Sequence, residues 1–332
     1  MSRPRLSSTV GRAGSGRVLG VALVGALLGA GGCTQEFPPF NRLDSLRVLG
    51  IRSEPAAPLP GESAIITPLV FTPVADDPSL TYQWSWCPAP GPAGSGYECL
   101  LKEAELAALL GPDIVVPSFD LGTAPTAMLP NALPPELLGA ICGGASPNVP
   151  RPNCAGGFPV QVSLTVKTDA EEVKAVVTAR WRFDPEVHAP NANPVVDGLT
   201  ATLPGGEPQF IPPADMLADD TITLPRKVGT SIKALAMEEA SEGYRGLDDD
   251  DQPADLRERL FITWFIETGG TDNTRTSYLP ERTPFETMLH NIWSPQESRL
   301  YAPNQARIYV VLHDNRGGVG WRSGIVHLEP TP

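Results

Sequence analysis

The chain has 332 residues and a formal net charge of −13, from 38 acidic and 25 basic residues. This acidic balance argues against a partner that is bound through its own negative charge, such as nucleic acid. The 37 prolines and 32 glycines are too many for a helical protein, while the 41% of apolar residues can fill a core. We therefore expect an all-β protein with many turns.

The first 32 residues have the pattern of a secretory signal peptide. Four arginines and no acidic residue precede an apolar run at residues 18–28, which is too short to span a membrane. Small residues follow, up to Cys33. The segment LGAGGC resembles the lipobox of bacterial lipoproteins, although Ala30 stands where that family usually has leucine. An uncleaved signal anchor and a soluble exported protein with Cys33 in a disulfide are the alternatives.

The lipobox resemblance implies that Cys33 is lipidated, becomes the first residue of the mature protein and carries acyl chains, palmitate among them. Thr34 follows it instead of the aspartate of an inner-membrane retention signal, which favours the outer membrane, on its periplasmic or its outer side. Cleavage would remove four arginines and no acid, taking the formal charge from −13 to −17. Residues 33–43 would form a tether.

Strand-like segments occur in the same order twice, which indicates an internal duplication. The first copy comprises residues 47–55, 61–71, 80–86 and 158–183, and the second comprises residues 194–204, 229–237, 260–266 and 306–329.

Apolar side chains alternate with polar ones along these segments, as in strands with one buried face. Tyr82, Trp84 and Trp86 share one face of the first copy, and Trp264 occupies the position of Trp84 in the second. Such alternation is typical of antiparallel sheets packed as a sandwich. We interpret the tryptophans as core residues and not as ligand platforms.

The YQWSW strand and the VVLHDNRGGVGW hairpin resemble tandem immunoglobulin-like, PKD-like and cadherin-like modules of Gram-negative, myxobacterial-type outer-membrane lipoproteins. The resemblance implies two tandem β-sandwiches, at residues 44–184 and 195–332, with a proline-rich linker at 185–194. In the hairpin turn, Asp314, Asn315, Gly317 and Gly318 suit a backbone that visits positive φ.

The first copy differs by an insertion at residues 88–157, which contains two helical patterns. Three of the four cysteines other than Cys33 lie in it, and the fourth, Cys87, directly precedes it. An even number of cysteines in an exported chain predicts two disulfides among Cys87, Cys99, Cys142 and Cys154. Equal gaps of twelve residues favour local pairing, and nested pairing is the alternative. We expect this segment to form a compact lobe that contacts a partner, or merely to cap the sandwich.

The second copy has an acidic loop at residues 238–258. Its consecutive aspartates are weak candidates for calcium ligands, because calcium-binding loops space their ligands; a solvated charged loop is the simpler interpretation. These aspartates are Asp248, Asp249, Asp250 and Asp251.

No catalytic motif is present, and the histidines are far apart in sequence, although His313 and His327 on the last hairpin could meet across strands. The sequence therefore favours a lipid-anchored, non-catalytic binding or structural module without a cofactor. Its expected partners are the membrane, through the lipid, and an envelope protein or glycan. The alternatives are a hydrolase with its site in residues 88–157 and a calcium-dependent adhesin or sugar-binding protein using the acidic loop.

Overall fold

The computed structural model describes residues 39–330, with gaps at 75–78, 92–95, 113, 144–151, 155, 187, 217–220, 248–252 and 297–303. Residues 39–332 cluster into one compact unit, separate from residues 1–38. Cys33 and the four aspartates of the acidic loop lie outside the described residues. Within the described residues, no helix has the length and apolar character to cross a membrane.

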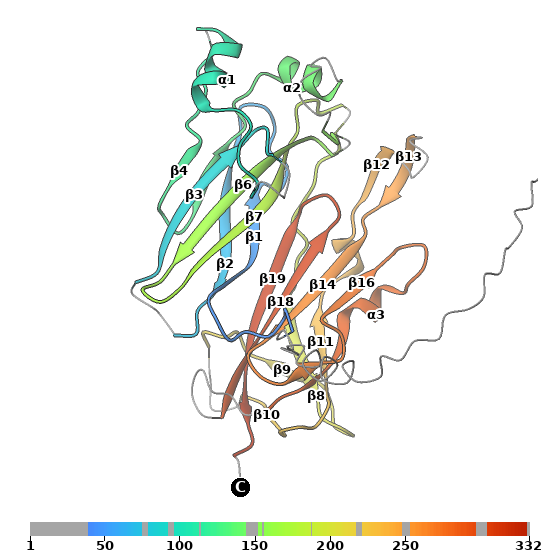
Figure 1. Cartoon of the computed structure of the whole chain (residues 1–332). Helices are drawn as coiled ribbons and strands as arrows, with labels where there is room; N and C mark the ends of the chain where they lie inside the picture. Colours follow the sequence, from blue (N-terminus) through green and yellow to red (C-terminus); the bar gives the residue numbers. More distant parts are fainter. Residues whose placement is uncertain are drawn as a thin grey trace, which may run out of the picture. The chain divides into compact units, whose positions relative to one another are not determined.

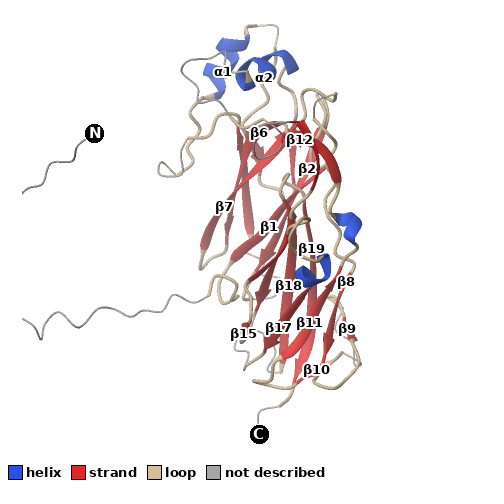
Figure 2. Cartoon of the chain, turned by 90° about the vertical axis from the view of Figure 1, so that its right-hand side faces the viewer, coloured by secondary structure: helices blue, strands red, loops and turns tan. Residues whose placement is uncertain are grey.

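The first sandwich consists of a three-stranded sheet, ordered β1-β2-β5, and a four-stranded sheet, ordered β4-β3-β6-β7 (Figure 1). Its strands are β1 (Arg47–Glu54), β2 (Ser63–Phe71), β3 (Thr81–Cys87), β4 (Asp120–Gly122), β5 (Ala127–Pro130), β6 (Phe158–Lys167) and β7 (Glu172–Trp181). It also carries helices α1 (Glu103–Leu110) and α2 (Pro135–Cys142), which lie at one end of the sandwich (Figure 2).

The second sandwich consists of two five-stranded sheets, ordered β15-β17-β11-β8-β9 and β10-β19-β18-β14-β16. The strands of the first are β8 (Gly198–Thr202), β9 (Gln209–Ile211), β11 (Thr230–Leu235), β15 (Gly270–Thr271) and β17 (His290–Ser294). Those of the second are β10 (Thr223–Leu224), β14 (Leu260–Ile266), β16 (Arg275–Tyr278), β18 (Gln305–Asp314) and β19 (Val319–Leu328). The remaining elements are a hairpin of β12 (Gly243–Leu247) and β13 (Pro253–Arg257), the 3-10 turn η2 (Glu238–Ala240) and helix α3 (Phe285–Leu289).

The two sandwiches share one strand arrangement, which is that of immunoglobulin-like folds. β1 pairs with β2 as β8 pairs with β11, and β3, β6 and β7 form the same run as β14, β18 and β19. Trp84 and Trp264 occupy equivalent central strands and are both fully buried. Their indole N–H groups donate to Ala124 O and Thr276 Oγ1, so each tryptophan combines core packing with a satisfied polar atom. The predicted fold class is confirmed.

The segment interpreted as one insertion, residues 88–157, is in fact two loops separated by two strands of the sandwich. β4 pairs with β3, and β5 pairs with β2, so residues 120–130 complete both sheets. Leu129 on β5 is fully buried in the first core. Sequence reasoning missed these strands because they are only three and four residues long, which leaves little room for an alternating pattern.

A third apolar cluster joins the two sandwiches. It contains Leu43, Leu49, Phe71, Tyr309, Val311 and Val319, all at most 6% exposed. β1 has a register shift between Val48 and Gly50, and Leu49 lies in the joining cluster whereas Ile51 lies in the first core. The prediction of a single buried face is therefore wrong for β18, because the first sandwich also covers the residues on its other face.

The segment before β1 belongs to this junction. Leu43 N donates to Ile266 O, Ile266 N donates to Asn41 O, and the Asn41 side chain donates to Trp264 O. Asn41 and Leu43 are both buried. Residues 41–43, assigned from the sequence to the tether, are therefore part of the folded unit, because β14 and the joining cluster take up their polar and apolar groups.

Candidate functional site

Each of the two loops of the first sandwich is closed by its own disulfide. Cys87, the last residue of β3, is bonded to Cys99, and Cys142, the last residue of α2, is bonded to Cys154. The Cα atoms are 5.6 and 5.9 Å apart, and both pairs span twelve residues. The structure thus has the local pairing and not the nested one.

The inner sides of these loops are part of the first core. Leu106 of α1 and Leu138 of α2 are buried in it. Trp86 donates its indole N–H to Ser118 O at 2.8 Å, and Gln161 on β6 donates to Tyr97 O at 3.0 Å. The loops are therefore fixed on the sheet by packing and hydrogen bonds as well as by disulfides.

The outer side of the first loop, residues 88–119, exposes large apolar side chains. Tyr97, Leu100 and Val115 are 43%, 55% and 85% exposed. Tyr97 has φ +60, which an aromatic residue rarely adopts. A loop that is fixed to the sheet on its inner side and exposes apolar side chains on its outer side is a candidate contact surface for a partner.

The linker between the sandwiches is held by a buried ionic cluster. Arg316, in the turn between β18 and β19, pairs with Glu258 at 3.0 Å and donates to Ala189 O at 2.7 Å. Its guanidinium lies over the Tyr244 ring, 4.6 Å from the centroid. Asp314 accepts from the backbone N–H groups of Arg316 and Gly318.

Burial shapes the protonation of this cluster. It raises the pKa of Glu258 to about 7, with the nearby Asp314 adding to the shift and Arg316 opposing it. Burial also raises the pKa of Asp314, against the hydrogen bonds that this carboxylate accepts. Glu258 closes the acidic loop in sequence, yet its side chain is only 1% exposed. The expectation of a solvated loop is therefore wrong at Glu258, because this side chain pairs with Arg316 in the interior of the junction.

The linker also passes directly over β19. Asn193 Oδ1 accepts from Val319 N at 2.9 Å, and the Asn193 side chain donates to Ser53 O in β1. A Cβ on Gly320 would lie 1.8 Å from Pro194 O, so only glycine leaves room for the linker there. Gly317 has the positive φ that the turn pattern predicts, at +105.

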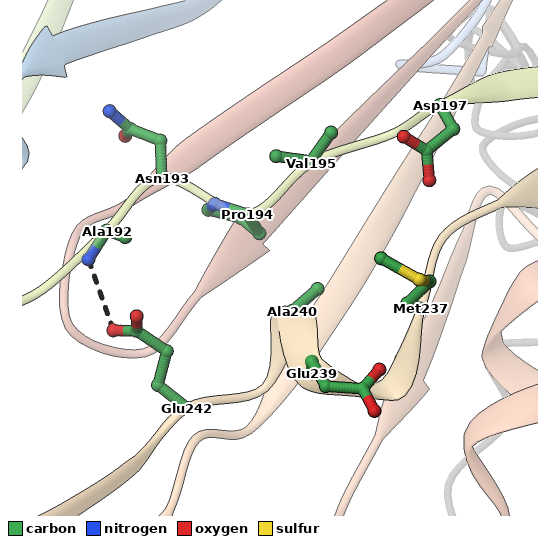
Figure 3. Close-up of a pocket in the computed structure, with 9 residues that line it drawn as sticks. All are labelled: Ala192, Asn193, Pro194, Val195, Asp197, Met237, Glu239, Ala240 and Glu242. Carbon is green, nitrogen blue, oxygen red and sulfur yellow. Dashed lines mark hydrogen bonds between the residues drawn. The ribbon is translucent and has the colours of Figure 1, made fainter.

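A groove of about 430 Å³ runs beside the linker (Figure 3). Glu242 forms one end of it and accepts a hydrogen bond from Ala192 N at 3.1 Å. The exposed side chains of Val195 and Met237 make its surface apolar, and Asp197 and Glu239 add carboxylates. The described lining of the groove thus combines apolar side chains with the carboxylates of Asp197, Glu239 and Glu242.

The histidines of the last hairpin lie far apart. His313 pairs with Val319 near the turn, whereas His327 pairs with Gln305 at the other end of the two strands. His313 stacks on Phe261 at 4.7 Å, and burial together with Arg275 lowers its pKa to about 4. Among the residues that the structure describes, no group of three His, Cys, Asp or Glu side chains could hold a metal ion.

Sequence reasoning missed Arg316 and Glu258 as the centre of the junction. The two residues are 58 positions apart and belong to no motif. The signal that was available is Gly320, because this glycine lies inside β19, beyond the residues that the turn requires.

No protein-family model matches the chain, and no curated protein matches it. Among solved structures, the chain is similar to fibronectin(III)-like modules of Clostridium thermocellum CbhA, with 8% identity over 85% of this chain and 95% of that one, at a TM-score of 0.23. It is also similar to part of a bacterial ice-binding adhesin (12% identity, 82% and 59% covered, TM-score 0.19) and to extracellular domains 3–5 of Drosophila OTK (10% identity, 89% and 99% covered, TM-score 0.18). The fold class rests on the strand order of the two sandwiches.

Proposed function

We propose that this protein is a non-catalytic binding and scaffold module of the cell envelope, attached to the outer membrane by a lipid on Cys33. The observation that carries the proposal is the place where the chain enters the folded unit. Asn41 and Leu43 are fixed on β14, at the junction of the two sandwiches. An anchor at Cys33 would therefore hold both sandwiches by their junction and not by one end.

The length of the tether supports a platform close to the membrane. Asn41 follows Cys33 by eight residue steps, which span at most about 29 Å when fully extended. The joining cluster and the linker contacts couple the sandwiches. A coupled pair of domains on a short tether suits a platform better than a long flexible spacer.

In this proposal the partner contact lies on the loops closed by disulfides. Cross-links lower the conformational entropy that a loop loses on binding, and the first loop presents Tyr97, Leu100 and Val115. A protein or glycan of the envelope fits such a surface. The acidic charge of the chain disfavours nucleic acid.

The proposal is tested by replacing the anchor residue. Cys33→Ser should release the chain from the membrane fraction or leave an uncleaved precursor, and should abolish incorporation of labelled palmitate. Thr34→Ser, which keeps the cysteine, is the matched control and should fractionate like the parent. A Cys33→Ser protein that is cleaved normally and still sediments with membranes would overturn the anchor.

A further inference from the structure

A second, smaller pocket of about 150 Å³ lies at the junction, on the side where the β12–β13 hairpin comes next to the first sandwich. Its walls come from three parts of the chain: Asn153, Gly156 and Arg180 of the first sandwich, Ala189 of the linker, and the hairpin and turn of the second sandwich. The last group contributes Tyr244, Arg245, Gly246, Asn315 and Arg316. The described residues that line this pocket include three arginines and no carboxylate.

The three guanidinium groups differ in how their charge is balanced. Arg316 pairs with Glu258 at 3.0 Å and with Glu242 at 3.8 Å, and Arg245 pairs with Asp255 at 3.1 Å in an exposed ion pair. Arg180 donates through Nη1 to Asn153 O at 2.7 Å and to Gly157 O at 3.3 Å. No carboxylate among the described residues pairs with Arg180.

A half-buried guanidinium without a counter-ion is unfavourable, because arginine keeps its charge in proteins while burial removes its water. The shift of the Arg180 pKa, lowered by burial, agrees with this. The Nε and Nη2 groups of Arg180 make none of the hydrogen bonds of the described residues. With respect to the described residues these two groups are available, in the forked geometry that suits planar or tetrahedral oxygen anions.

Tyr244 adds a donor from the opposite wall. Its hydroxyl accepts a hydrogen bond from Asn315 Nδ2 at 3.4 Å, which leaves its O–H able to donate. The stacking of Arg316 on its ring holds the side chain in place. The pocket thus has positive charge and oriented donors, and its volume admits one compact group.

We propose that this pocket binds a small oxygen anion, of the size of sulfate, phosphate or a single carboxylate, between Arg180 of the first sandwich and Tyr244 and Arg245 of the second. Such an anion would supply the counter-charge that Arg180 does not receive from the described residues. Because its ligands come from both sandwiches, it would also strengthen their junction. The proposal does not depend on the lipid anchor.

The test uses the full chain and follows its melting temperature during titration with sodium sulfate or phosphate at constant ionic strength, with chloride as the reference. We expect a saturable rise in the parent protein, and isothermal titration calorimetry should show one site. Arg180→Gln should lower the affinity for the anion at least tenfold. Lys174→Gln, which removes one positive charge from an exposed position of the same strand, should leave the binding unchanged.

Two further variants keep the test decisive if Arg180→Gln folds poorly. Arg245→Gln and Tyr244→Phe change exposed or peripheral donors, and each should lower the affinity for the anion severalfold. Acetate and N-acetylglutamate test whether the pocket instead accepts a carboxylate that a partner offers. Binding of either class of anion supports the site. The class that binds more tightly shows whether the natural ligand is a free inorganic anion or a carboxylate. Equal shifts in the parent, Arg180→Gln and Lys174→Gln would show a general salt effect and overturn the proposal, as would the absence of binding by all four anions.

Discussion

At the scale of single residues, the junction depends on groups that face one another across long stretches of sequence. Glu258 is almost fully buried and lies beside both a cation, Arg316, and another acid, Asp314. Such an arrangement makes the carboxyl group hold its proton more tightly in the folded state than in the unfolded chain. Its protonation is therefore linked to the stability of the fold.

We expect Glu258 to make the protein less stable as the pH rises. Its pKa is about 7 in the folded state against an ordinary glutamate pKa of 4.5, so between these values the folded state binds more protons than the unfolded state. The contribution of Glu258 to the free energy of unfolding is fully present below pH 4.5 and is lost as the pH rises through 7, by about 3 kcal/mol in all.

Urea unfolding at a series of pH values measures this effect. Glu258→Gln should flatten the decline between pH 4.5 and 7, while Glu186→Gln, at an exposed position, should keep it. His313 contributes with the opposite sign, since its lowered pKa of about 4 costs stability as the pH falls below 6.5. That contribution is common to both variants and cancels in the comparison; parallel profiles for all three proteins would contradict the assignment.

At the scale of elements, the first sandwich carries two separate loops and not one lobe. One loop leaves β3 and returns at β4, and the other leaves β5 and returns at β6. Removing residues 88–157 as a block would also remove β4 and β5. Each loop has to be altered on its own. This is feasible because each loop is closed by a separate disulfide.

We expect the two disulfides to act independently. Replacing Cys142 and Cys154 by alanine should lower the free energy of unfolding by about 3 kcal/mol, as for a loop of this length, and should leave the bond between Cys87 and Cys99 intact. The converse pair of substitutions should behave in the same way, and the two losses should add. Thiol counting and non-reducing peptide mapping provide the check; new free thiols at the untouched pair would argue against separate loops.

At the scale of the whole folded unit, the two sandwiches are joined by an apolar cluster, a fixed linker and the segment that precedes β1. These three connections involve β1, β14, β18 and β19, so the junction is continuous with both folds. We expect the parent protein to unfold in a single transition for this reason, although it contains two complete sandwiches.

Gly320→Ala tests that coupling. The added methyl group would meet Pro194 O, which has to move and take Asn193 away from Val319 N and Ser53 O. We expect a loss of about 1–3 kcal/mol and two resolved unfolding transitions, followed by tryptophan fluorescence in urea. Gly270→Ala is the matched control, because a Cβ there meets no atom within 4 Å, and it should unfold like the parent. Equal behaviour of the two variants would show that the linker position is not what couples the sandwiches.

The sequence by itself determined the all-β class, the duplication, the buried tryptophans Trp84 and Trp264, and the two short helices. These features follow from local patterns: alternation with period two, apolar spacing along a helix, and prolines and glycines at its ends. The equal spacing of the cysteines also favoured the local pairing, because short loops close at low entropic cost.

Only the tertiary structure decided how the two sandwiches are joined. Tyr309, Val311 and Val319 belong by strand parity to an outer face, and they are buried because a second domain covers that face. The pair of Arg316 and Glu258 and the pocket around Arg180 bring together residues from different domains. No periodicity records such contacts, since they depend on where complete sheets meet and not on the local sequence of either one.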